Sequence, residues 1–272
     1  MANEKEKNKK VTEVRKPYMT GDIIDEHTIK SSIAFLGTLI AVFFISFIVC
    51  ASASFDSVIL RMGINLAVLV MILVIVYHNG AGRGAEAVSR GEILYQKKEK
   101  GQTFSETERK VCFHPLKGYA TAMIGTIPFL VAAVILALNT SVQRTGAGTL
   151  PSWMQAYTAR SDVGNALVNY TNPEGMDFVD YLRSFVRICI IPWVNIVGYS
   201  NKYGMMLVEQ LSPVILLLPA AAYGTGYLTG RTIRTRIHTA ISENEKKRIR
   251  RENKKRKAHM NSNRRREPEQ LN

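Results

Sequence analysis

The sequence predicts an all-α integral membrane protein with four transmembrane helices. Four runs of 21 to 26 residues contain no Asp, Glu, Lys or Arg, and they lie at 31–55, 62–82, 118–143 and 210–230. A helix needs about 20 mainly apolar residues to cross a hydrocarbon core of about 30 Å, so each run is long enough to span a bilayer. The mean hydropathy of −0.02 is near zero only because all 36 basic and 22 acidic residues lie outside these runs.

The spans divide the chain into membrane and aqueous segments. We predict transmembrane helices at 31–53, 58–77, 118–139 and 206–228, joined to a hydrophilic N-terminal segment 1–30, a charged connector 78–117, a long insertion 140–204 and a basic tail 229–272. Residues 1–30 mix 7 basic with 6 acidic residues, which is unlike the n-region of a signal peptide, so the first span is expected to be a retained anchor. The tail is expected to be partly disordered, beyond about Met260.

The distribution of basic residues predicts the orientation. Segments 1–30, 83–117 and 229–272 carry 7, 8 and 15 Lys and Arg, whereas the 65 residues of 140–204 carry only 5. Basic residues near span ends collect on the cytoplasmic side. Four spans place the three basic segments on one side, so we expect a cell-membrane protein with both termini and the 78–117 connector in the cytoplasm and the 140–204 insertion outside.

A further apolar stretch inside the insertion is too short to be a span. Residues 188–201 form an uncharged run of 14, and a fifth span would also place the basic tail outside. Just before it, Phe178, Leu182, Phe185 and Cys189 recur at helical spacing. We therefore expect an amphipathic helix within about 176–199 that lies in the outer headgroup layer, with capping of the helix bundle as the alternative.

The two halves of the chain share a local pattern. His27 to Lys30 precedes Gly37-Thr38, and His114 to Lys117 precedes Gly125-Thr126, at offsets of 87 and 88 residues. The second span of each half then runs into a charged, helical segment. The pattern predicts a parallel duplication of two hairpins, although Gly-Thr pairs are common in apolar helices and coincidence is the alternative.

Small residues recur at helical spacing near the inner ends of the second and fourth spans. Ala222, Gly226 and Gly230 share one face of the fourth span, and Gly80 and Gly84 form a shorter copy. Such spacing lets helix backbones approach closely. It predicts helix packing at a close crossing near the inner face, with a homo-oligomer seam as the alternative.

Polar residues cluster in the sequence near the outer ends of the second and fourth spans. Arg61 is able to reach the headgroups alone, because long basic side chains extend toward the interface. The alternative is an outer polar cluster that forms the entrance for a substrate or ion and pairs Arg61 with Asp56 or Glu209, with Asn65 one turn deeper.

The basic tail is the strongest functional signal. Ile233, Ile237 and Ile241 form an apolar stripe, and a basic run follows: Lys246, Lys247, Arg248, Arg250, Arg251, Lys254, Lys255, Arg256 and Lys257. Each basic residue near an anionic leaflet contributes about 1 kcal/mol of attraction. We expect the tail to contact anionic inner-leaflet lipid or a protein partner. Contact with nucleic acid or the ribosome is the weaker alternative, because no aromatic residue follows Leu228 for base stacking.

No catalytic, metal-binding or cofactor-binding motif is present in the sequence. The three cysteines have no CxxC spacing, the five histidines form no HExxH pair, and there is no glycine-rich phosphate loop. We therefore predict no catalytic residues, cofactor or metal, and a non-enzymatic interaction or assembly component. The alternative is a small transporter or channel subunit with its polar entrance around Arg61 and Glu209.

Overall fold

The computed structural model describes residues 13–52, 57–140, 178–198 and 201–264, and the regular structure among them is helical. The helices are α1 (Glu26–Ser52), α2 (Val58–Glu99), α3 (Glu106–Lys110), α4 (Lys117–Asn139), α7 (Phe178–Cys189), α8 (Ile191–Val197) and α9 (Lys202–Arg264). Asp56, most of the predicted 140–204 insertion and the end of the tail beyond Arg264 lie outside the described residues.

Four helices are long and apolar enough to cross a membrane. They are Glu26–Ala51, Val58–Glu99, Lys117–Asn139 and Lys202–Met260, and each contains an 18-residue window that is strongly apolar. The four predicted apolar helices are therefore confirmed, and the fold is compatible with a multi-pass membrane protein. Their outward faces carry large exposed apolar side chains such as Ile40, Val70 and Val131, which suits lipid rather than water.

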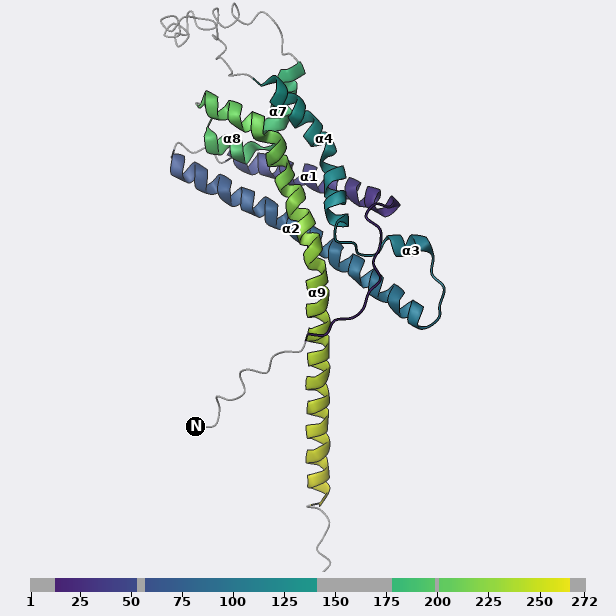
Figure 1. Cartoon of the computed structure of the whole chain (residues 1–272). Helices are drawn as coiled ribbons and strands as arrows, with labels where there is room; N and C mark the ends of the chain where they lie inside the picture. The colour runs from purple at the N-terminus through teal and green to yellow at the C-terminus, as the bar shows by residue number, and fades with distance from the viewer. Residues whose placement is uncertain (1–12, 53–56, 141–177, 199–200, 265–272) are drawn as a thin grey trace, which may run out of the picture.

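The bundle is organised around α9, which packs against both α2 and α4, while α1 packs against α4 (Figure 1). Its largest cluster of buried side chains draws on α1, α2, α4, α7 and α9 and includes Leu39, Val76, Leu136 and Leu216. The helices α1 and α2 are neighbours in sequence but contact each other less than α2 contacts α9. The packing core therefore joins the first and last parts of the chain.

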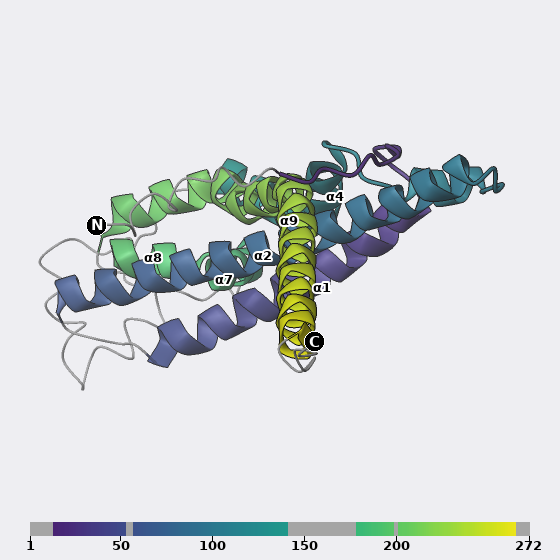
Figure 2. The same ribbon diagram turned by 90° about the horizontal axis from the view of Figure 1, so that it is seen from below.

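Helices α2 and α9 both continue well beyond the apolar region. After Tyr77, α2 continues through Ala, Glu, Lys and Arg residues, which are good helix formers, despite four glycines, and it ends only before Gly101, whose φ of 71° is left-handed. Helix α9 contains Pro213 and Pro219, residues that bend a helix. Its C-terminal half leaves the bundle and points toward the viewer in Figure 2, whereas α1 and α2 run across the picture.

The predicted amphipathic helix is present as two short helices, and the apolar stripe assigned to it is packed only in part: Cys189 is buried, Leu182 packs against the main core cluster and the Phe185 ring stacks on Phe129 of α4. Arg183, Val186 and Cys189 are the buried residues of α7, whereas Phe178 and Phe185 are exposed. Helix α8 buries Val194 completely, and both helices pack on the bundle. These contacts correspond to the capping alternative. The buried face differs in part from the prediction because ion pairs hold the arginine side of α7 inward.

Residues 13–22 form an extended segment, here called the N-terminal strap. The backbone N–H of Met19 donates to the carbonyl oxygen of Gly91 in α2 at 3.1 Å, and that of Gly21 donates to Phe113 at 3.1 Å. The N–H of Val14 donates to the hydroxyl of Thr239 in α9 at 3.0 Å. The strap thus ties α2, α9 and the loop after α3 together at the end of the bundle that is predicted to face the cytoplasm, here called the inner end.

Candidate functional site

The small residues of α2 and α9 meet at one close crossing. A Cβ atom added to Gly80 would clash with the carbonyl oxygen of Tyr223, and one added to Gly84 would clash with that of Tyr227. On the opposing helix, a Cβ on Gly226 would clash with the carbonyl oxygen of Tyr77. Four facing glycines, with Gly230 set against Gly84 and Ala85, therefore allow the two backbones to touch.

This crossing lies within one chain, so α2 occupies the small-residue face of α9. Ala222, one turn earlier on α9, is half-buried against the main core cluster. A second copy of the chain would have to displace α2 to use the same face. The geometry therefore favours close packing inside the chain over a homo-oligomer seam at these glycines.

Glu209 in α9 is the centre of a buried ion-pair cluster at the opposite end of the bundle, here called the outer end after its predicted orientation. Its side chain is 1% exposed. One carboxylate oxygen accepts from Nε of Arg187 at 2.7 Å, and the other accepts from Nε of Arg183 at 3.3 Å and from the Thr140 hydroxyl at 3.0 Å. Arg183 also pairs with Asp180. The cluster joins α4, α7 and α9 and balances its own charges.

The predicted pairing of Arg61 with Glu209 is not observed. The carbonyl oxygen of Arg61 accepts from the Asn65 amide at 2.7 Å, and the Asn65 oxygen accepts from Asn195 of α8 at 3.3 Å. The Arg61 guanidinium lies beside Gly198, its Nε has no partner, and no ion pair of Arg61 is found among the described residues.

The predicted outer polar cluster is therefore split into two separate sites, because α7 brings its own arginines to Glu209. Arg183 and Arg187 lie four residues apart, on one face of a helix. The spacing of Arg183 and Arg187, together with a single glutamate in the fourth apolar span, could have predicted these ion pairs from the sequence.

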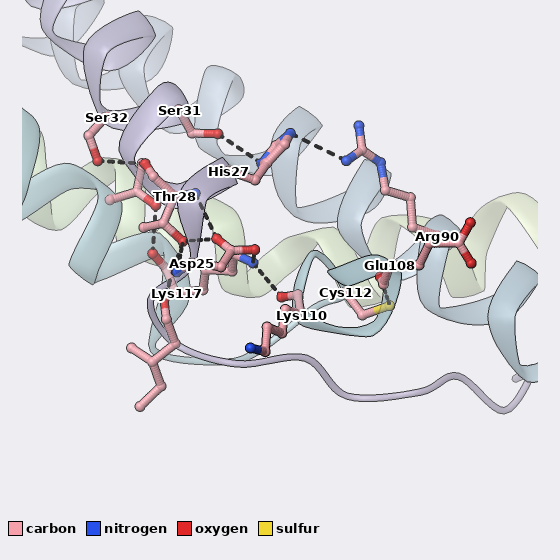
Figure 3. Close-up of polar contacts among 12 residues, drawn as sticks. Asp25, His27, Thr28, Ser31, Ser32, Arg90, Glu108, Lys110, Cys112 and Lys117 are labelled. Atoms are coloured by element: carbon pink, nitrogen blue, oxygen red, sulfur yellow. Dashed lines mark hydrogen bonds and ion pairs between the residues drawn. The ribbon is translucent and has the colours of Figure 1, made fainter. Parts of the chain in front are cut away.

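A second polar cluster lies at the inner end, between the start of α1 and the start of α4 (Figure 3). The Lys117 ammonium lies 3.1 Å from an Asp25 carboxylate oxygen, and the two side chains are only 5% and 6% exposed. The backbone N–H of Thr28 donates to Asp25 at 2.7 Å, so Asp25 also caps α1. Burial raises the pKa of Asp25, but the hydrogen bonds from Thr28 and Lys117 outweigh it and hold the pKa below 3.8.

His27, Arg90 and Cys112 surround this cluster without forming a reactive site. His27 bridges the Ser31 hydroxyl, 3.2 Å from Nδ1, and the Arg90 guanidinium, 3.3 Å from Nε2. Cys112 is buried, and this desolvation raises the pKa of its thiol. Among the described residues, no group of three or more His, Cys, Asp or Glu side chains is arranged to hold a metal ion.

A buried acidic residue fixes the direction of the basic tail. Glu92 of α2 accepts from Nε and Nη2 of Arg234 at 3.1 and 2.9 Å. Nε2 of His238, one turn further along α9, lies 2.9 Å from the other oxygen of Glu92. Glu92 is 6% exposed, and this three-residue clasp holds the first turns beyond the apolar part of α9 against α2.

Beyond Glu243, where the strap no longer covers the helix, residues 244–260 of α9 are all exposed. All nine predicted contact residues between Lys246 and Lys257 are exposed. Ile237, Ile241 and Ile249 are exposed as well, while Ile233 is half-buried. The tail therefore presents a continuous basic surface with apolar side chains beside it.

Comparison of the chain with protein-family models, curated proteins and solved structures found no match.

Proposed function

We propose that this protein is a non-enzymatic membrane component that holds a rigid basic helix against the anionic inner leaflet. The observation that carries the proposal is the continuity of α9 from an apolar bilayer-length segment to nine exposed basic residues. A helix does not hinge freely, so the position of the tail follows from the packing of the bundle. The Glu92 clasp and the glycine crossing both support that coupling.

Charge and apolar surface both favour lipid as the surface that the tail contacts. Nine basic residues near an anionic leaflet, each contributing up to about 1 kcal/mol, give an attraction of the same order as one myristoyl chain at about 0.8 kcal/mol per buried CH₂. Exposed Ile237, Ile241 and Ile249 add an apolar edge that a purely solvated helix does not need. The tail leaves the bundle rather than continuing along it, which is the direction that a helix lying on a membrane surface requires (Figure 2).

The orientation belongs to the same proposal. Both termini and the α2–α4 connector are placed in the cytoplasm, because their basic residues follow the positive-inside rule. A Ser262→Cys variant in a background that lacks the three native cysteines tests it. A membrane-impermeant maleimide should leave this cysteine unlabelled in sealed cells and label it after permeabilisation. Labelling of sealed cells would place the tail outside and refute the proposal.

The transporter alternative has less support in the observed contacts. It depended on an open polar entrance around Arg61 and Glu209, but Glu209 is buried among Arg183, Arg187 and Thr140. A protein partner for the tail remains the competing occupant of the same basic surface, and the experiment below separates it from lipid.

Trypsin provides a direct assay of tail contact, because it cleaves after lysine and arginine. The full chain is reconstituted in nanodiscs of phosphatidylcholine alone or mixed with phosphatidylserine. Anionic lipid should protect the 246–257 segment from cleavage, and about 1 M salt, where the Debye length is near 3 Å, should abolish much of that protection.

Two variants make the assay specific. Replacing the nine basic residues by glutamine also removes their trypsin sites, so this variant and the wild type are both digested with Glu-C, which cleaves after Glu252. Phosphatidylserine should slow that cleavage in the wild type and have no effect on it in the variant. Replacing Lys97, Lys98 and Lys100, which lie at the exposed end of α2, should leave the effect of phosphatidylserine unchanged. Equal cleavage of the wild-type tail in both kinds of nanodisc would refute lipid contact and favour a protein partner for the basic surface.

A further inference from the structure

A groove runs between the N-terminal strap and the first turns of the tail. Its volume is about 720 Å³, within the usual range of small-molecule sites. Residues of the strap form one wall and residues of α9 form the other: Glu13, Arg15, Arg231, Thr232, Thr235, Arg236, Thr239, Ala240 and Glu243. The hydrogen bond from Val14 to Thr239 holds the two walls together.

The lining combines arginines with threonine hydroxyls. Arg15 is already paired with Glu13 at 2.7 Å, so the strap wall is close to neutral. On the α9 wall, Arg231 and Arg236 are exposed and Glu243 lies further along the helix. The Arg231 guanidinium stacks over the Tyr18 ring at 5.6 Å, which holds its position at the start of the groove.

The groove and the apolar edge of the tail lie on opposite sides of α9. Thr235 and Thr239 are in the groove, and Ile237 and Ile241 each follow one of them by two positions. Two residues turn a helix by about 200°, so the isoleucines point away from the groove. When the isoleucines rest on lipid, the groove faces the aqueous phase and is reached by a soluble ligand. A lipid headgroup reaches it only if α9 turns its groove face toward the membrane instead.

We propose that this groove binds a phosphorylated ligand. Arg231 and Arg236 pair with its phosphate oxygens, because guanidinium groups match the geometry of phosphate and stay charged. The hydroxyls of Thr235 and Thr239 donate to carbonyl oxygens of α9 itself, so the two arginines are the groups that hold the phosphate. Phosphate of this kind is supplied by a soluble phosphorylated molecule or by a phosphoinositide headgroup, and the experiment distinguishes these sources. The site does not depend on lipid contact by residues 246–257.

Binding is measured on the full chain with two probes. The first is inorganic pyrophosphate, added to detergent-solubilised protein and followed by titration calorimetry. The second is phosphatidylinositol bisphosphate in phosphatidylcholine nanodiscs, followed by cross-linking of the headgroup to the protein. Substituting both Arg231 and Arg236 with glutamine should weaken binding by about tenfold or more for each arginine removed.

Two further variants separate a site from general charge and from misfolding. Lys254→Gln with Arg256→Gln removes the same charge from the exposed tail and should change pyrophosphate binding by less than about twofold, because screening weakens distant charges. Glu243→Gln removes a negative charge from the groove and should tighten binding, a gain that misfolding does not produce.

Pyrophosphate binding that is weakened by the arginine substitutions and tightened by Glu243→Gln supports a soluble ligand. The same variant effects seen with phosphatidylinositol bisphosphate but not with pyrophosphate support a lipid headgroup. The proposal is overturned if neither probe binds, or if the groove variants and the tail variants lose binding equally. Trypsin protection of the tail is scored separately on the same proteins, so failure of the groove and failure of lipid contact by the tail are told apart.

Discussion

Replacement of Glu209 by glutamine tests how much the outer ion-pair cluster stabilises the bundle. The carboxylate is 1% exposed and contacts two guanidinium groups whose side chains are 10% and 21% exposed. Removing one partner of a buried pair typically costs about 3–5 kcal/mol, because the remaining charge loses its compensation. Arg183 keeps its pair with Asp180, so the lower figure of about 3 kcal/mol applies.

The assay is thermal unfolding of the purified protein in detergent at one fixed scan rate. For chains of about this length, 1 kcal/mol shifts the midpoint by roughly 2–4 °C, so Glu209→Gln should lower it by about 6–12 °C. The fixed scan rate matters because irreversible unfolding makes the midpoint depend on it. Glu252→Gln is the matched control, since it breaks an ion pair whose side chains are 73% and 55% exposed and should cost about 0.5 kcal/mol or less.

A double-mutant cycle identifies the partner. Glu209→Gln combined with Arg187→Gln should be less damaging than the sum of the single changes, with a coupling of about 1 kcal/mol or more. Combined with Arg61→Gln, it should be additive within about 0.5 kcal/mol. A shift no larger than that of the Glu252 control, or stronger coupling to Arg61 than to Arg187, would refute the assignment.

The remaining predictions concern the inner end of the bundle. Gly84→Ala should destabilise by about 1–3 kcal/mol because its Cβ meets the backbone of α9, whereas Gly82→Ala, with open space around its Cβ, should be neutral or stabilising in the same melt. The pKa of Asp25 is lowered in the folded protein, so its pairing with Lys117 stabilises the fold above about pH 4, and this stabilisation is lost as the pH falls through the folded pKa. Asp25→Asn should therefore destabilise the protein least at pH 3 and most at pH 6. A stability difference between wild type and variant that stays constant over this pH range would contradict the assignment. Cys112, whose thiol pKa is raised by burial, should resist maleimide at neutral pH until the protein is denatured, as mass spectrometry will show.

The four long helices could be predicted from the sequence because the criterion is local. A run of about 20 uncharged apolar residues is enough to indicate a bilayer-length helix, whatever its neighbours. Local chemistry also explains where α3 begins. Ser105 stands three residues before Glu108, a spacing typical of a helix N-terminus, and the Ser105 hydroxyl accepts from the N–H of Thr107 at the start of Glu106–Lys110.

The partners of the buried charges could not be predicted in the same way. Glu209 had three candidate arginines at sequence distances of 22, 26 and about 150 residues, and nothing in composition ranks them. The choice depends on the rotation of α7 about its own axis. That rotation could not be read from the apolar pattern, because apolar side chains on more than one face of α7 contact the bundle: Val186 is buried, and Phe185 stacks on Phe129.

The middle and the ends of the bundle contribute differently to the specificity of the fold. Apolar side chains in the middle do not select one helix pairing over another, because a leucine has a similar free energy whether it faces lipid or a neighbouring helix. Charges at the ends are not, because a buried charge without its partner is costly. Glu209 at the outer end, and the Asp25–Lys117 pair and the Glu92 clasp at the inner end, each join helices that are distant in sequence. Hydrophobicity therefore determines that these helices form, whereas a few buried ion pairs and the facing glycines determine which helices meet and how the basic tail is aimed.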